Sequence, residues 1–173
     1  MITLEQQKWI DHLSDTSKTE IFPFDPKSGD KFEQIKSQIQ SILGTDIEVL
    51  HRGASSLGIS GQKEIDVYIP IPPEKIDEFA VEMEKVFGKP KSIYLLERTK
   101  FLAYIDGTKL EIMLTNKDHQ NWVNGERFFN YIKGNKEALE SYKKLKEEGN
   151  GVSCREYYRR KTEFINDVLS KIT

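Results

Sequence analysis

Residues 50–69 read LHRGASSLGISGQKEIDVYI, and this stretch is the main reason to expect an enzyme. An apolar segment runs through a loop of small residues into a second apolar segment that carries Glu64 and Asp66. Side chains two apart on a β-strand point to the same face, so these two carboxylates are expected side by side. Neighbouring carboxylates need a cation or hydrogen-bond donors to share their charge. The stretch therefore predicts a strand–loop–strand unit with a polar binding site.

The loop itself favours contact with an anion. Gly53 lets a ligand approach the backbone N–H groups, and Ser55 and Ser56 offer hydroxyl donors. A phosphate-binding loop followed by metal ligands is the layout that phosphoryl transfer needs. The alternative is an ordinary flexible turn, with His51 more often structural than catalytic at such a position.

A third acid is expected from a later strand. Asp106-Gly107 is a strong hairpin signal, and the returning strand over residues 109–115 carries Glu111 on its polar side. If this strand neighbours the strand over residues 64–70, then Glu64, Asp66 and Glu111 converge on a site for Mg²⁺ (or Mn²⁺). The alternative is that Glu111 faces solvent on a one-sided sheet.

Basic and aromatic residues elsewhere are candidate ligand contacts. Arg98 and Lys100 flank the centre of the expected sheet, where they either touch phosphate oxygens or act as edge charges that discourage aggregation. In the C-terminal helices, basic and aromatic side chains alternate in a way that suits base stacking and phosphate neutralisation. These candidates are Lys146, Tyr157 and Lys161, with helix packing as the alternative.

Composition narrows the class of protein. The 173 residues, 37% hydrophobic and 31% charged, suit one soluble domain. No apolar run approaches the ~20 residues of a membrane helix, and the start of the chain does not resemble a secretory signal. The single cysteine, Cys154, excludes an internal disulfide and favours a cytoplasmic location.

Charge is unevenly distributed along the chain. Residues 1–120 hold 15 basic and 20 acidic side chains, and residues 121–173 hold 11 and 8. The whole molecule carries a formal charge of −2 and has no continuous basic run. Nucleic acid therefore ranks last among the expected partners.

The pattern of elements predicts an α/β (α+β) fold, with a mixed sheet, flanking helices and a C-terminal helical lobe. Helices are expected after Thr3, over residues 30–43 and from Pro72 to residue 87, and from Asn116 to the end of the chain. Strands are expected over residues 46–51, 64–70, 93–98, 100–105 and 109–115. We expect a single domain, with a sheet-containing core over residues 1–120 and the helical lobe over residues 121–173.

Several motifs together resemble the GrpB-like family. They are Phe24-Asp-Pro, Phe32-Glu, Leu43-Gly, the run from His51 to Ser56, Gly58, Ile65-Asp66, Trp122, Tyr131-Ile, Tyr142-x-x-Leu-Lys146 and Tyr157-x-x-x-Lys161. The resemblance covers roughly residues 22–169. It implies the nucleotidyltransferase superfamily, whose members share the palm fold of polymerase β.

The resemblance also implies a function. Gly53-Ala54 stands where the superfamily usually has Gly-Ser, but both acids of the motif are present, and Glu111 matches the third-acid strand. The leading hypothesis is transfer of a nucleotidyl group from an NTP, ATP first, to an unknown acceptor. Glu64 and Asp66 would hold Mg²⁺, and Glu111 would take the acceptor's proton. The alternative is a non-catalytic nucleotide- or metabolite-binding module.

Overall fold

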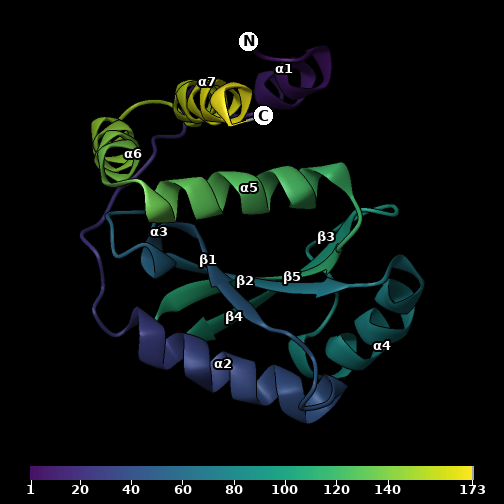
Figure 1. Cartoon of the computed structure of the whole chain (residues 1–173). Helices are drawn as coiled ribbons and strands as arrows, with labels where there is room; N and C mark the ends of the chain where they lie inside the picture. Colours follow the sequence, from purple (N-terminus) through teal and green to yellow (C-terminus); the bar gives the residue numbers. More distant parts are fainter. Residues whose placement is uncertain (173) are drawn as a thin grey trace. The chain divides into compact units, whose positions relative to one another are not determined.

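The computed structural model describes residues 1–172, which divide into two compact units (Figure 1). The first, here the helical unit, comprises residues 1–23, 60–62 and the chain from Glu126 onward. The second, the sheet unit, comprises residues 24–59 and 63–125. The first helix thus groups with the C-terminal helices rather than with the sheet.

The sheet unit contains a mixed five-stranded sheet in the order β1-β2-β5-β4-β3. The strands are β1 (Leu50–Arg52), β2 (Glu64–Ile71), β3 (Ser92–Tyr94), β4 (Arg98–Ile105) and β5 (Thr108–Asn116). β2 and β5 are parallel, and the other neighbours are antiparallel. The hairpin between β4 and β5 turns at Asp106 and Gly107, which both have positive φ, as the sequence predicts.

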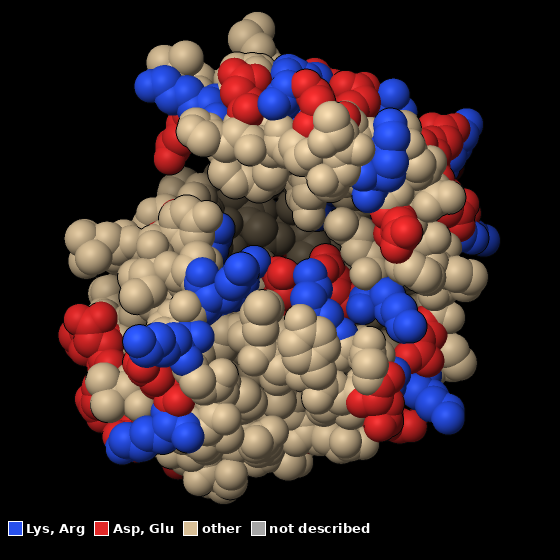
Figure 2. Space-filling view, turned by 180° about the vertical axis from the view of Figure 1, so that it is seen from behind, with Lys and Arg blue, Asp and Glu red and all other residues tan. Residues whose placement is uncertain are grey.

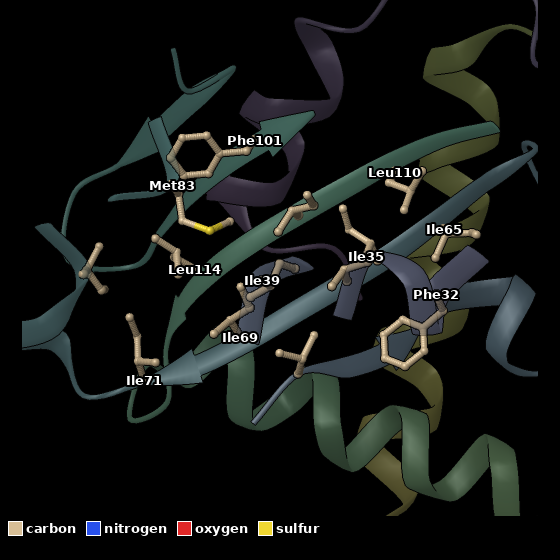
Figure 3. Packing of buried hydrophobic residues seen from close by; sticks show 14 residues of the cluster. Phe32, Ile35, Ile39, Ile65, Ile69, Ile71, Met83, Phe101, Leu110 and Leu114 are labelled. Atoms are coloured by element: carbon tan, nitrogen blue, oxygen red, sulfur yellow. The ribbon is translucent and has the colours of Figure 1, made fainter. Parts of the chain in front are cut away.

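One face of this sheet is covered by helices and forms the hydrophobic core (Figure 3). The covering helices are α2 (Ser28–Leu43) and α4 (Ile76–Phe87), the latter preceded by a 3₁₀ turn, η1 (Pro73–Lys75). Alternate residues of β2 and β5 point into the core, where they meet the apolar stripe of α2. The side chains labelled there include Ile35 and Ile39 of α2, Ile65 and Ile69 of β2, and Leu110 and Leu114 of β5.

Three expected elements are wrong in their bounds. The strand expected over residues 46–51 begins only at Leu50. The side-chain amide of Gln40 donates to the carbonyl oxygens of Thr45 and Ile47, and these hydrogen bonds hold residues 44–47 in a turn. Residues 53–56 form one helical turn, α3 (Gly53–Ser56), instead of an open loop. The strand expected over residues 93–98 ends at Tyr94 in a tight turn.

The helical unit is built from α1 (Leu4–Asp11), the C-terminal part of α5 (Gln120–Gly134), α6 (Lys136–Glu148) and α7 (Cys154–Lys171). Of these helices, α1, α6 and α7 have side-chain N-caps. Thr3 and Gln6 form the expected capping box, and Asn135 and Ser153 cap α6 and α7 through their side chains. Trp9 of α1 is 43% exposed and packs edge-on against Tyr158 of α7.

The structure is therefore the expected mixed α+β fold. Within residues 1–172 it has five strands and seven α-helices. None of the helices in this part of the chain is both long enough and apolar enough to cross a membrane.

Candidate functional site

The second face of the sheet, here the polar face, brings the three predicted acids together. β2 and β5 run side by side with Asp66 directly across from Glu111, and Glu64, two residues earlier on β2, across from Lys109. Alternation then places all three side chains on the face opposite the core. Arg52 of β1 also lies across from Asp66, and Tyr104 of β4 across from Lys109. The convergence expected from the spacing is confirmed.

Lysines share the charge of these acids. The Lys109 ammonium lies 2.7 Å from Glu64 Oε2 and 3.1 Å from Glu111 Oε1, so it bridges two strands. Lys100 Nζ of β4 donates to the other Glu111 oxygen at 2.7 Å. On this face the sheet therefore carries a chain of alternating charges.

The pairing decides the protonation of the cluster. Burial by itself lowers the pKa of Lys109, but the contacts with Glu64 and Glu111 outweigh burial and raise that pKa above its usual value. Burial by itself raises the pKa of Glu111, but Lys100 and Lys109 together hold that pKa below its usual value. Lys109 and Glu111 are thus both charged at neutral pH.

The arrangement does not fit the expected Mg²⁺ or Mn²⁺ site. Among residues 1–172, no group of three or more His, Cys, Asp or Glu side chains is arranged to hold a metal ion. A divalent cation would lie about 2.0–2.6 Å from carboxylate oxygens, and Lys109 already occupies the space between two of them.

The loop after β1 places its backbone against the site. Gly53 has φ +73°, and a Cβ at this position would lie only 1.9 Å from Asp66 Oδ2. Glycine is therefore needed both for the backbone conformation and for the close approach of the Asp66 carboxylate.

The two loop serines make internal hydrogen bonds. Ser56 donates its hydroxyl to the Gly53 carbonyl, and Ser55 Oγ lies 2.9 Å from His51 Nε2. His51 also stacks on Phe32 at 4.7 Å, and its burial, with the charge of Arg52, lowers its pKa to about 4. His51 is thus neutral at pH 7 and holds the loop, which agrees with the structural role expected for it. Phosphate binding by Gly53, Ser55 and Ser56 stays a prediction.

The two candidates on β4 have different surroundings. Lys100 belongs to the charge chain, whereas Arg98 pairs with Glu97 and lies 4.4 Å from the centre of the Tyr94 ring. Arg98 is across from Thr115, four residues along β5 from Glu111, which is about 13 Å at about 3.3 Å per residue. The structure therefore brings Lys100, but not Arg98, to the acids.

The three candidates of the C-terminal helices lie in the helical unit. Tyr157 is fully buried, and its ring packs against Gly149. Lys146 is 4% exposed and donates to the Tyr157 hydroxyl at 3.3 Å. The Lys161 ammonium lies 5.4 Å from the centre of the Tyr158 ring. Lys146 and Tyr157 therefore stabilise the interior of this unit, and a nucleotide contact for any of the three stays a prediction.

Two residues of the polar face, Lys109 and Tyr68, were missed as site candidates from the sequence. Lys109 lies two residues from Glu111 on the same strand and therefore on the same face, and such a spacing of a lysine and an acid is a signal of pairing. Tyr68 follows Asp66 by two residues, and its ring contacts Trp122 of α5 with centroids 5.3 Å apart. An aromatic pair therefore adjoins the acids.

Comparison with known proteins identifies the family. The family model described as GrpB protein matches residues 18–171, which is nearly the whole chain. This chain belongs to the GrpB family. The family resemblance expected from the sequence motifs is thus confirmed.

A solved GrpB structure has the same fold. The crystal structure of conserved protein GrpB from Enterococcus faecalis matches with a TM-score of 0.69 at 18% identity, covering 88% of this chain and 96% of that one. At this identity the likeness shows the fold alone. Among curated proteins, none matches this GrpB-family chain.

Proposed function

We propose that this GrpB-family chain binds a nucleotide, or a related phosphorylated metabolite, on the polar face of its sheet and does not transfer a nucleotidyl group. The observation that carries the proposal is the position of Lys109, in contact with both Glu64 and Glu111. An ammonium in that position excludes a second cation by space and by charge. The face thereby keeps donors for a phosphate without presenting the metal centre that transfer requires.

The chemistry of the face supports a ligand with a phosphate and an aromatic ring. The Lys109 side chain is 36% exposed, and that of Lys100 is 23% exposed, so both can reach a ligand from solvent. Tyr68 and Trp122 are partly exposed and in contact with each other, and Tyr68 lies two residues from Asp66 on the same face of β2, where one ring can stack on a base. These groups suit a nucleotide better than a simple inorganic anion.

A second candidate is the metal-dependent nucleotidyltransferase expected from the resemblance. It is favoured by the direct pairing of Asp66 with Glu111 across β2 and β5. It requires Lys109 to leave both carboxylates when Mg²⁺ and the NTP bind. The two candidates therefore differ in their dependence on magnesium.

Isothermal titration with ATP, GTP, CTP and UTP, each in EDTA and in excess Mg²⁺, separates them. The proposal expects at least one nucleotide to bind equally well in both buffers, with no product by ion-exchange chromatography after incubation with Mg²⁺. Turnover that needs Mg²⁺ and disappears in Asp66→Asn would instead establish the transferase. Absence of binding for every nucleotide in both buffers would overturn the proposal.

A variant pair locates the base. Tyr68→Leu removes the ring beside Trp122 and should weaken nucleotide binding about tenfold, because stacking contributes about 1–3 kcal/mol per base. Tyr94→Leu on the edge strand β3 is the matched control and should bind as the unmodified protein does. Equal effects of the two changes would contradict a base-binding role for Tyr68.

A further inference from the structure

We propose that Lys109 replaces the divalent cation on the polar face, both as the counter-ion that holds the carboxylates and as a direct donor to the ligand's phosphate. The second role rests on the proposed function, and the first does not. The inference assigns to one side chain the two tasks that a magnesium ion performs in metal-dependent sites.

The contacts of Lys109 match the first task. Its ammonium lies 2.7 Å from Glu64 Oε2 and 3.1 Å from Glu111 Oε1, and thus joins β2 to β5 where a shared ion would join them. The positive charge of Lys109 thus lies between two carboxylates, as the charge of a shared cation would.

The charge of the polar face is balanced without a metal. Three acidic and three basic side chains occupy neighbouring register positions of β1, β2, β5 and β4, and a bound Mg²⁺ would leave an excess of two positive charges. The six are Glu64, Asp66, Glu111, Arg52, Lys100 and Lys109.

The geometry leaves Lys109 a donor for the second task. A lysine ammonium has three N–H donors, and the contacts with Glu64 and Glu111 use two of them. The side chain is 36% exposed, so the third donor is accessible to an anionic oxygen that approaches the sheet. A phosphate oxygen bound there would be held by the same group that orients the carboxylates.

The first experiment measures Mn²⁺ binding by electron paramagnetic resonance in the full chain. The unmodified protein should leave the spectrum of free Mn²⁺ unchanged, whereas Lys109→Met and Lys109→Gln should bind Mn²⁺ at least about 30-fold more tightly. This factor is the effect of one unit charge on a dication about 4 Å away in a water-like dielectric. Two neutral replacements guard against a variant that fails to fold.

Controls show whether the gained ion lies on the polar face. Lys85→Met removes the same charge from the exposed face of α4, where Lys85 pairs with Glu82, and should behave as the unmodified protein. Adding Glu64→Gln to Lys109→Met should remove most of the gained affinity. Tight Mn²⁺ binding by the unmodified protein, or no gain in either Lys109 variant, would overturn the inference.

A second experiment separates this inference from the proposed function. ATP is titrated in EDTA into the unmodified protein and into Lys109→Gln, with an expected loss of about tenfold in affinity, since a charge-assisted hydrogen bond is removed. If ATP and the other nucleotides fail to bind the unmodified protein, the proposed function fails, but the Mn²⁺ result still decides the first role of Lys109. If ATP binds equally to both proteins, the phosphate contact is wrong.

Discussion

Replacing Gly53 with alanine tests the close approach between the loop and the carboxylate of Asp66. The added Cβ would lie 1.9 Å from Asp66 Oδ2 and 2.9 Å from its Cγ, so the aspartate side chain must move. The backbone at Gly53 also has φ +73°, which an alanine adopts with strain. Both effects destabilise the folded sheet unit, and they can be measured separately.

Gly58 provides the matched control, because it has φ +70° and nothing within 4 Å of an added Cβ. Gly58→Ala should therefore cost only the backbone term, about 1 kcal/mol. Gly53→Ala should lower the free energy of unfolding by the same backbone contribution and by about 2 kcal/mol more for the displaced Asp66 carboxylate, which is about 3 kcal/mol in total. The expected difference between the two variants is thus about 2 kcal/mol.

The assay is urea unfolding at pH 7.5, followed by circular dichroism and by tryptophan fluorescence. In an Asp66→Ala background the carboxylate is gone, and Gly53→Ala should then cost no more than Gly58→Ala does. Equal destabilisation by Gly53→Ala and Gly58→Ala in the unmodified background would refute the reasoning. So would a Gly53→Ala cost that stays the same after Asp66 is replaced.

Three further predictions concern titration, a buried hydrogen bond and the core. Burial, with the Arg52 charge, lowers the pKa of His51 from 6.5 to about 4, so the unfolded chain binds more protons between these pH values and stability falls as pH is lowered through them. We expect the free energy of unfolding, measured with urea, to fall by about 2 kcal/mol between pH 7.5 and pH 4.5 after allowance for partial exposure. The fall should be smaller in His51→Gln, and an equal fall in both proteins would contradict this assignment. Tyr157→Phe removes the hydroxyl that accepts from Lys146 and should cost about 1 kcal/mol in the same assay at pH 7.5, whereas no change would show that this hydrogen bond is not stabilising. Met83→Ala leaves a cavity in the core and should lower the free energy of unfolding by about 3 kcal/mol. Val86 lies on the same helix and is 47% exposed, so Val86→Ala should lower it by less than about 1 kcal/mol.

Local sequence signals predicted most elements because the responsible interactions are between near neighbours. Thr3 and Gln6 form a capping box, and Asp106-Gly107 makes the hairpin. One wrong bound arises where a side chain binds the backbone of the next segment of the chain. Gln40 of α2 binds the carbonyl oxygens of Thr45 and Ile47, and no period in the sequence reveals that capture.

The site was predicted in part. The two-residue period of β-strands was enough to put Glu64 and Asp66 on one face, and the parallel pairing of β2 with β5 then placed Glu111 beside them. Register alone did not reveal which cation the carboxylates contact. That depends on how far a long, flexible lysine side chain reaches across the strands, which is a three-dimensional property of Lys109.

Apolar periodicity and short motifs were enough to predict the mixed fold, the GrpB family and the shared face of Glu64 and Asp66. The contacts of Lys109 with Glu64 and Glu111, and the close approach of Gly53 to Asp66, emerge only in the folded chain. The physical reason is that a charge in a partly buried site takes the nearest opposite charge, and strand register with side-chain reach sets which one is nearest.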